Sequence, residues 1–387
     1  MRRSTAFTQP WSGPSRAGAV SPDAQLLKES FALVEPVADK VAGYFYGRMF
    51  TECPALREMF PVTMDVQRAR LLTALVRVIQ GTDTPELLTP YLRQLGRDHR
   101  KFDVQPEHYE VVGRCLVAAI AKYAEDAWTE EMERAWTTAY TAMAAAMIDA
   151  AGRMAARAPA WWNAEIVAHE RRANDLAVIG VRLDGSFPYH AGQYVSLQTS
   201  RWPRVWRPYS VANAPRANLL ELHIKAVGAG WVSNALVWHT KPGDMLRIGP
   251  PLGSMRVDPE SPRGVVCVAG GVGLAPMKAI IDDMTRWNRS RSAVVFFGVR
   301  RSEDLYDLPA LRALADAHPW LTVVPAVSEE PTYVGEQGLI SEVVRRYGPW
   351  DDHDVFIAGS PEMIRATLRT LDTLGVPPFR VHYDAFG

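Results

Sequence analysis

A glycine-rich turn follows a run of apolar residues in the last third of the chain. After Val-Val-Cys-Val-Ala come Gly270, Gly271 and Gly273, and Pro276 stands three residues further on. Glycines at the end of a buried strand let backbone N–H groups and the start of a helix approach a pyrophosphate closely. We expect a helix to open at Pro276, where the missing N–H of proline loses nothing because it would have no partner. We therefore expect a nucleotide-binding strand–turn–helix, with a plain turn between a strand and a helix as the alternative. Pro276 stands where the usual dinucleotide fingerprint has its last glycine.

Two motifs upstream of this turn contain side chains suited to a flavin nucleotide. An Arg-Pro-Tyr-Ser run extends from Arg207 to Ser210, and a Gly-x-x-Ser run ends at Ser233. Arginine binds a phosphate through two parallel hydrogen bonds, and tyrosine offers a flat face to a ring. Arg207 and Tyr209 are therefore candidates for holding a flavin. The alternative is a strand end with a surface arginine.

The first part of the chain offers few ligands for a metal. Its histidines within the first 150 residues are His99 and His108. The three cysteines of the chain are too few and too scattered for a disulfide framework, a zinc finger or a four-thiolate iron–sulfur cluster. An electron acceptor for a flavin module is then expected to be haem. His108 lies just after Pro106, at an expected helix start, whereas His99 lies within the helical pattern; taken alone, His99 is also explained as an ordinary surface or core histidine.

Hydrophobic patterning divides the chain into a tail and three domains. Residues 1–21 are rich in Pro, Gly, Ser and Arg and are expected to be disordered. Residues 22–157 have apolar residues at helical spacing, which predicts an all-α domain. Residues 160–262 form short alternating segments between turn residues, which predicts an antiparallel sheet or small β-barrel. In residues 263–387 buried-strand runs alternate with helical stretches, which predicts an α/β domain with a parallel, doubly wound sheet.

The charge balance bounds the partners of the chain. Among 387 residues, 43 are basic and 43 are acidic, so the formal net charge is zero. No overall positive field attracts a polyanion, and we expect neither a nucleic acid nor an anionic membrane as partner. No run reaches the roughly 18 apolar residues of a membrane span, and no apolar signal stretch follows Arg2 and Arg3. We expect a cytoplasmic monomer whose partners are small molecules.

The order and spacing of the three motifs resemble the ferredoxin–NADP reductase family over about residues 161–387. The resemblance implies a β-barrel that carries FAD and an α/β domain that binds NADH or NADPH. In that family the first motif packs on the flavin ring and binds its phosphate, and the serine of the second assists at the pyrophosphate. The matching residues, with the glycine-rich turn, are Arg207, Tyr209, Ser210, Ser233, Gly270, Gly271, Gly273 and Pro276. Phe386 matches an aromatic residue that related reductases place against the isoalloxazine until nicotinamide displaces it.

The segments around His99 and at residues 44–50 and 54–60, ahead of these motifs, resemble the flavohaemoglobins from about residue 21 to the C-terminus. The resemblance implies a globin domain that carries haem b, followed by the reductase module. His99 matches the proximal iron ligand, and Phe60 matches a phenylalanine that packs against the haem. The distal positions of the family are matched by Tyr46, Gln67 and Leu71.

A distal tyrosine is also reasonable on physical grounds. Oxygen bound to ferrous haem carries partial negative charge, and a phenol in an apolar pocket stabilises it by donating a hydrogen bond. Packing between helices is the alternative for Tyr46, and an exposed helical position is the alternative for Gln67.

The chain departs from the family pattern on the proximal side. Tyr109 matches a tyrosine that the family pairs with a glutamate, both near the proximal histidine, but Ala151 stands at the glutamate position. Asp149 is two residues away, about 200° around the helix, and is expected on the wrong face. Asp98 stands where a lysine usually precedes the histidine. A further departure, Ala358-Gly359-Ser360 in place of the reductases' Cys-Gly-Pro, bears on the rate of hydride transfer and not on the fold.

The resemblance implies an NAD(P)H-dependent nitric oxide dioxygenase. NADH or NADPH reduces FAD, FAD passes single electrons to the haem iron, and the ferrous–oxygen haem converts nitric oxide to nitrate. Two alternatives stay open: an oxygen-binding or gas-sensing globin with a module that keeps its iron ferrous, and a reductase for another acceptor such as a quinone. The strand that ends at Arg300-Arg301 offers no acid for a ribose 2′-hydroxyl, so a 2′-phosphate could be tolerated. Solvated charges at a strand end are the alternative for this arginine pair.

Overall fold

The computed structural model describes residues 22–384. The predicted tail at residues 1–21 and Phe386 lie outside the described residues. The chain divides into two compact units, with the boundary between Ala156 and Arg157. The first unit is helical, and the second contains two six-stranded sheets.

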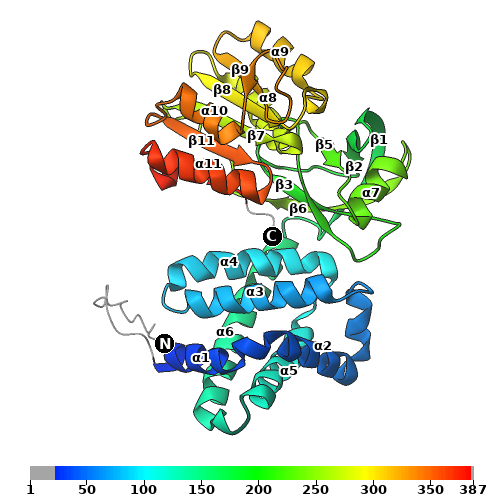
Figure 1. Ribbon diagram of the computed structural model, residues 1–387. Coiled ribbons are helices and arrows are strands. Elements are labelled where there is room, and N and C mark those ends of the chain that lie inside the picture. Colours follow the sequence, from blue (N-terminus) through cyan, green and yellow to red (C-terminus); the bar gives the residue numbers. More distant parts are fainter. Residues whose placement is uncertain (1–21, 385–387) are drawn as a thin grey trace, which may run out of the picture. The chain divides into compact units, whose positions relative to one another are not determined.

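The helical unit is built from amphipathic helices, as the spacing of its apolar residues predicts (Figure 1). The helices are α1 (Pro22–Val34), α2 (Ala38–Glu52), α3 (Asp65–Gly81), α4 (Pro85–His99), α5 (Pro106–Ala124) and α6 (Glu130–Ala155), and a 3₁₀ segment lies in each connection except that between α3 and α4. In their shared core, the Trp136 indole N–H donates to the Ser30 hydroxyl at 2.8 Å. This bond joins α6 to α1 and satisfies two polar groups that would be costly to bury alone.

Helices α4 and α6 approach each other closely at Gly96. A Cβ atom at this position would lie only 2.2 Å from the carbonyl oxygen of Met147. Glycine is therefore required for the two backbones to come this near. Because His99 ends α4 one turn later, this contact also anchors the segment that carries the histidine.

The second unit begins with an antiparallel sheet in the order β4-β3-β6-β1-β2-β5. Its strands are β1 (Trp162–Ala173), β2 (Leu176–Leu183), β3 (Tyr194–Thr199), β4 (Arg207–Ser210), β5 (Leu219–Lys225) and β6 (Met245–Leu252), with α7 (Trp231–Trp238) after β5. A bridge between Val211 and Leu222 joins the residue after β4 to β5, so the two ends of the sheet meet. The sheet thereby curls around one apolar core.

A parallel sheet in the order β10-β9-β8-β7-β11-β12 completes the unit. Its strands are β7 (Gly264–Gly270), β8 (Ala293–Val299), β9 (Leu321–Val327), β10 (Glu336–Gln337), β11 (His353–Ala358) and β12 (Val381–Tyr383). Its helices are α8 (Leu274–Trp287), α9 (Leu308–Ala317), α10 (Ile340–Tyr347) and α11 (Pro361–Thr373). One apolar cluster joins α8 and α9 to one face of the sheet, and a second joins α10 and α11 to the other (Figure 1).

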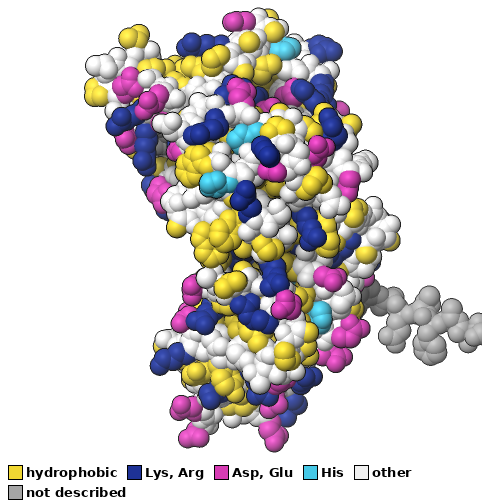
Figure 2. Space-filling model, turned by 90° about the vertical axis from the view of Figure 1, so that its right-hand side faces the viewer, with side chains coloured by type: hydrophobic (Ala, Val, Ile, Leu, Met, Phe, Trp, Pro, Cys, Tyr) yellow, Lys and Arg dark blue, Asp and Glu magenta, His cyan; other side chains and the backbone are white. Residues whose placement is uncertain are grey.

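The predicted fold class, all-α followed by antiparallel β and then α/β, is confirmed. The exact domain boundaries drawn from the sequence stay predictions. No helix within residues 22–384 is long and apolar enough to cross a membrane. On the face shown in Figure 2, basic and acidic side chains are interspersed, with no broad area of one sign.

Candidate functional site

His99 is the last residue of α4, and its ring is oriented by the helix that carries it. Its Nδ1 lies 2.8 Å from the carbonyl oxygen of Leu95, one turn earlier. A carbonyl only accepts hydrogen bonds, so Nδ1 carries the proton and Nε2 has a free lone pair. Burial lowers the pKa of the His99 imidazole, which favours this neutral form. The ring is thus prepared to bind a metal through Nε2.

His108, the other histidine of the helical unit, has a structural role. Its Nδ1 accepts the backbone N–H of Gln105 at 3.1 Å, and so caps the first turn of α5. A ring nitrogen held in this way is not oriented as a ligand. The structure therefore distinguishes the two histidines, and favours His99.

Tyr46 on α2 is buried among aromatic rings. The Tyr46 ring lies edge-on to Phe60 at 5.6 Å between centroids, and Phe50 packs beside both. Its hydroxyl donates to the backbone carbonyl of Gln67 at 3.2 Å. Burial raises the pKa of the Tyr46 phenol, so the group stays protonated and remains a hydrogen-bond donor.

The other two predicted distal residues lie on α3 but differ in environment. Leu71 is partly buried and packs into the same apolar cluster as Tyr46 and Phe60. The Gln67 side chain instead accepts a hydrogen bond from Arg70 at 3.3 Å, among exposed groups. The structure therefore brings Tyr46, Phe60 and Leu71 together, whereas Gln67 contributes its backbone carbonyl.

Neither Asp149 nor Asp98 accepts the Nδ1 proton of His99, whose partner is the Leu95 carbonyl. Asp149 is exposed and pairs with Arg153 along α6, as its helical position predicts. Asp98 forms a 2.5 Å ion pair with Lys101, whose side chain is only 6% exposed. Ala151 on α6 has no polar side-chain atom. The Nδ1 proton of His99 therefore has a neutral acceptor.

Tyr109 on α5 lies in a small apolar cluster with Leu92 and Met147. Burial raises the pKa of the Tyr109 phenol to about 12. Within residues 22–384 its hydroxyl makes no hydrogen bond to a protein group. The cluster contains residues from both α4 and α6, which places Tyr109 on the side of the unit that holds His99.

The Arg-Pro-Tyr-Ser motif forms β4, at one end of the antiparallel sheet. All four of its side chains are partly exposed, and the Tyr209 ring packs against the barrel core. Arg207 donates one guanidinium N–H to the Trp206 carbonyl at 3.0 Å. Arg207 is partly exposed, so its guanidinium keeps further N–H donors that a phosphate can accept from.

Ser233 acts within the turn that precedes and opens α7. Its hydroxyl donates to the Gly230 carbonyl at 3.1 Å and accepts the Val227 N–H at 3.4 Å. The serine therefore shapes the turn, and the N–H groups in the first turn of α7 remain for a ligand. Its predicted assistance at a pyrophosphate would be indirect.

The glycine-rich turn is held by very close backbone contacts. Gly271 has a φ of +54°, in the region that favours glycine. A Cβ on Gly273 would lie 2.2 Å from the carbonyl oxygen of Ala358, at the end of the neighbouring strand β11. Helix α8 begins at Leu274, so Pro276 is its third residue and not its first; the N–H it lacks is still one that has no partner within the helix.

Asp384 is a site residue that the sequence analysis did not find. Its Oδ1 accepts the backbone N–H of Ser254 at 3.2 Å, and its buried Oδ2, which lies beside Gly253, has no partner. Burial raises the pKa of this carboxyl group. The only sequence signal was that Asp384 stands two residues before Phe386, the aromatic position that the resemblance implies.

Acidic residues lie closer to Arg300 than the sequence alone indicates. Glu329 and Glu330 follow β9, the neighbour of the strand that ends before Arg300. Glu330 accepts the Ser302 N–H at 2.8 Å, and Glu329 forms a 3.6 Å ion pair with Arg300. The adjacent strand therefore supplies acids that the strand before Arg300 itself lacks.

Three domain families match successive parts of the chain. The globin family matches residues 43–147, the oxidoreductase FAD-binding domain residues 163–257, and the oxidoreductase NAD-binding domain residues 267–369. The flavohemoprotein of Vibrio cholerae is 28% identical over 386 residues, which covers 94% of this chain and 96% of the relative. The chain belongs to the flavohaemoglobin family.

Other proteins are similar to this flavohaemoglobin in part or in whole. The ferredoxin–NAD(P)⁺ reductase component of the naphthalene 1,2-dioxygenase system of Pseudomonas putida is 33% identical over 226 residues, or 57% of this chain and 67% of the relative. The crystal structure of the flavohemoglobin from Malassezia yamatoensis covers 95% of this chain and 100% of its own, with a TM-score of 0.78 and 21% identity. At that identity the structural likeness establishes the fold.

Proposed function

We propose that this flavohaemoglobin uses NADH or NADPH to reduce FAD, passes electrons from FAD to a haem b, and converts nitric oxide to nitrate with oxygen. The observation that carries the proposal is the free Nε2 of His99, in a helical unit that also buries the Tyr46 phenol among apolar residues. The same chain contains both reductase domains. The similarity to flavohemoproteins over 94% of the chain supports it. The oxidoreductase class follows from the family, and the nitric oxide chemistry is the proposed part.

The residues of the helical unit fit a haem. Residues 22–384 contain no group of three or more His, Cys, Asp or Glu side chains that could hold a metal ion. An iron bound to His99 therefore needs the nitrogens of a porphyrin. Phe60 and Leu71 supply apolar contacts for such a ring on the side of Tyr46. The flavohemoglobin of Malassezia yamatoensis contains bound FAD and haem, which supports this assignment.

The second unit fits a flavin and a nicotinamide nucleotide. We assign Arg207, Tyr209 and Ser210 to the flavin, and the glycine turn at residues 270–273 to the nicotinamide nucleotide. The partnerless Oδ2 of Asp384 needs a hydrogen-bond donor, which a cofactor N–H or a water would supply. When bound, FAD takes up a hydride and releases single electrons, and haem provides the iron at which oxygen and nitric oxide react.

Tyr46 is the residue of the chain that we assign to oxygen. Its protonated hydroxyl donates to the Gln67 carbonyl, and this single hydrogen would have to rotate away from that carbonyl to donate to a ligand in the pocket. The loss of the Gln67 bond sets part of the cost of this rotation. Phe50 and Phe60 confine the ring, so the hydroxyl has few other orientations.

The organisation of the protein is part of the same proposal. We assign haem binding to residues 22–157, FAD binding to residues 160–262 and nucleotide binding to residues 263–387. The matched family segments lie within these ranges and support them. We further propose a cytoplasmic monomer, which size-exclusion chromatography with light scattering and cell fractionation test directly.

A second candidate function is favoured by the proximal side. Because the Nδ1 proton of His99 has a carbonyl partner and not a carboxylate, the iron would resemble that of an oxygen carrier. The protein would then be an oxygen-binding globin whose reductase keeps the iron ferrous. A quinone reductase would instead be supported by rapid quinone reduction that does not need haem.

Nitric oxide consumption under oxygen tests these functions against one another. We expect the wild-type protein to consume nitric oxide with NADH or NADPH and to form nitrate. His99→Ala should abolish this reaction, whereas His108→Ala, which changes the other histidine of the unit, should retain it. Slow consumption together with stable oxygen binding would support the carrier function and contradict the dioxygenase.

A further inference from the structure

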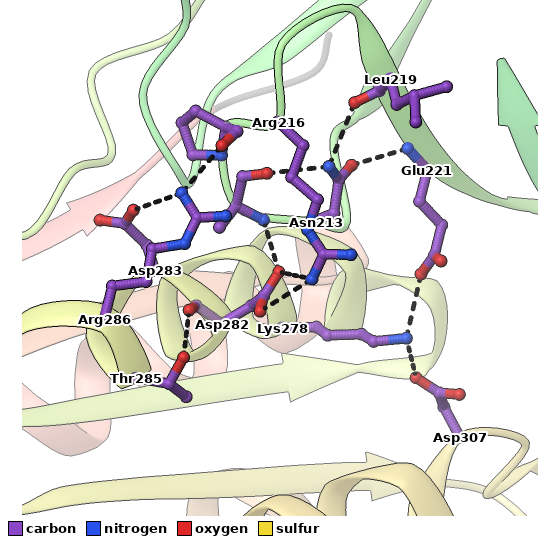
Figure 3. A network of polar contacts seen from close by, with 12 residues as sticks. Asn213, Arg216, Leu219, Glu221, Lys278, Asp282, Asp283, Thr285, Arg286 and Asp307 are labelled. Atoms are coloured by element: carbon purple, nitrogen blue, oxygen red, sulfur yellow. Dashed lines mark hydrogen bonds and ion pairs between the residues drawn. The ribbon is translucent and has the colours of Figure 1, made fainter. Parts of the chain in front are cut away.

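Helix α8 contacts the barrel through a regular row of charged side chains. Lys278, Asp282 and Arg286 recur every four residues, on one face of the helix, and form what we call the α8 stripe. Each of the three contacts a residue of the antiparallel domain (Figure 3). The nucleotide turn lies at the start of this helix, so the stripe holds the element that continues directly from it.

Lys278, at the first position of the stripe, joins the two domains. Its ammonium lies 3.0 Å from Glu221 on β5 and 2.7 Å from Asp307, which is only 2% exposed and precedes α9. Glu221 also accepts the Nε2 proton of His223 at 2.9 Å. His223 Nδ1 then accepts the hydroxyl hydrogen of Tyr306 at 2.7 Å, since its other nitrogen carries the proton.

Asp282 and Arg286 fasten the segment that follows β4. Asp282 Oδ2 accepts the Ala214 backbone N–H at 2.9 Å and lies 3.0 Å from Arg216. Arg286 donates to the Pro215 carbonyl at 2.8 Å. Two consecutive residues of this segment are therefore bonded through their backbones, which makes their position depend on α8.

Asn213 makes the same segment rigid on the barrel side. Its side-chain oxygen accepts the Glu221 N–H at 2.7 Å, and its amide donates to the carbonyl oxygens of Ala214 and Leu219 (Figure 3). The segment cannot shift without breaking bonds to β5. A displacement of α8 would therefore be transmitted to the end of β4, only a few residues away.

We propose that the α8 stripe positions the nicotinamide-binding turn relative to β4, and so sets the geometry of hydride transfer. The inference rests on the proposed binding of flavin to β4 and of nicotinamide to the glycine turn. Lys278, Asp282 and Arg286 are positioning residues, because they touch neither cofactor site. Hydride transfer is sensitive to this geometry, since a misplacement of about 1 Å can slow a reaction about 100-fold.

The test compares broken and conserved contacts in the flavin-loaded, full-length protein. Lys278→Met and Asp282→Ala remove the contacts, and Lys278→Arg retains the charge. The control Arg365→Met removes an exposed ion pair within α11. Reduction of the flavin by NADH, measured by stopped flow, should slow about 10- to 100-fold in Lys278→Met and Asp282→Ala, with NADH affinity nearly unchanged. Lys278→Arg and Arg365→Met should stay near the wild-type rate.

Two further readouts separate positioning from simple loss of stability. The long-wavelength charge-transfer band of stacked nicotinamide and flavin should weaken in the broken variants. Amide hydrogen exchange, measured also without flavin, should accelerate at residues 211–216 while the core of the barrel stays protected. If the other variants do not fold, Arg286→Met replaces them in the test. The Arg286 side chain is 43% exposed, so its substitution should disturb folding less.

The outcomes distinguish this inference from the function on which it rests. Wild-type rates and an unchanged charge-transfer band in folded Lys278→Met and Asp282→Ala proteins would overturn the positioning role alone. Wild-type protein that binds flavin yet is not reduced by NADH or NADPH would overturn the proposed function, and the positioning role with it. Slowed reduction with rescue by Lys278→Arg supports both.

Discussion

At the scale of single residues, the acceptor of the His99 Nδ1 proton is the decisive feature of the proposed haem site. The acceptor is the Leu95 carbonyl, one helical turn away, and it carries no full charge. A carboxylate acceptor would draw the proton further and make the imidazole a stronger donor to iron. Ala151 cannot provide one. We therefore expect an iron–histidine bond of ordinary globin strength.

Ala151→Glu should give the proximal side the carboxylate that it lacks at this position. The new carboxylate competes with Leu95 for the Nδ1 proton, lowers the reduction potential of the iron and raises the iron–histidine stretching frequency. Partners of this kind commonly change reactivity 10- to 100-fold. Resonance Raman spectroscopy and redox titration measure both effects, with Ala151→Gln as the uncharged control. A peroxidase-like stretching frequency already present in the wild-type protein would show that another acid reaches His99.

Tyr46→Phe should weaken oxygen binding without loss of the haem. Removal of a hydrogen bond to a charged acceptor costs about 1.5 to 3 kcal/mol, which corresponds to at least about a tenfold faster release of oxygen. The matched control is Tyr44→Phe, which removes the hydroxyl of the other tyrosine on α2; the Tyr44 ring lies edge-on to Tyr123. Flash photolysis gives the oxygen off-rate directly. An unchanged rate in Tyr46→Phe would mean that the phenol does not reach the ligand.

At the scale of elements, the sequence predicts what depends on local pattern. Helical spacing, alternating strands and buried-strand runs indicate the all-α, antiparallel and parallel parts in the correct order, and the fold class is confirmed. The start of α8 is misplaced by two residues, because a 3₁₀ turn at Gly271–Gly273 leads directly into the helix. The rotamer of Gln67 and the turn bonds of Ser233 were not predictable either. These details depend on neighbours that are brought near only by folding.

The acids near Arg300 illustrate the same limit. A reading along β8 finds arginines at its end, whereas the parallel pairing of β8 with β9 brings Glu329 and Glu330 to that place. The hydrogen bond from the Ser302 N–H holds the pKa of Glu330 below its ordinary value, so this carboxylate stays charged. A fixed negative charge repels a 2′-phosphate.

We therefore expect this protein to prefer NADH. Glu330→Gln should improve use of NADPH relative to NADH by about tenfold, because it removes a repulsive charge. The ratio of kcat/KM for flavin reduction by the two nucleotides is the measurement. Glu362→Gln, an exposed acid on α11, is the control. A ratio that does not change would place the 2′-phosphate away from Glu330.

The contact between Glu221 and its partners should make the reductase sensitive to acid. The hydrogen bond from His223, with the charge of Lys278, lowers the Glu221 pKa to about 2, from 4.5 in the unfolded chain. A lowered pKa means that the pairing stabilises the folded state above pH 4.5, and that this stability is lost as the pH falls through about 2. The protection of the β5 and α8 amides against hydrogen exchange, measured relative to the unfolded chain at the same pH, should therefore fall across this interval. In Glu221→Gln this protection should already be low at pH 6, and it should change less with pH.

At the scale of the whole molecule, the two proposed half-reactions lie in different compact units. Of the described residues, those up to Ala156 form one unit with its own apolar core, and those from Arg157 onward form the other. Units with separate cores can fold and bind ligands independently. Each half-reaction should then be removable by a substitution that leaves the other cofactor in place.

Gly273→Val and His99→Ala test this independence from opposite ends. A valine at position 273 would collide with the Ala358 carbonyl, since a Cβ there lies 2.2 Å from it, and so should displace the nucleotide turn. We expect at least about 100-fold slower reduction by NADH, with FAD and haem both retained, and normal oxygen binding after reduction by dithionite. His99→Ala should do the reverse: it loses stable haem but reduces dyes with NADH at the wild-type rate. A Soret band of normal intensity in His99→Ala would contradict the assignment of the iron ligand, and loss of flavin in the same protein would show that the two units do not fold independently.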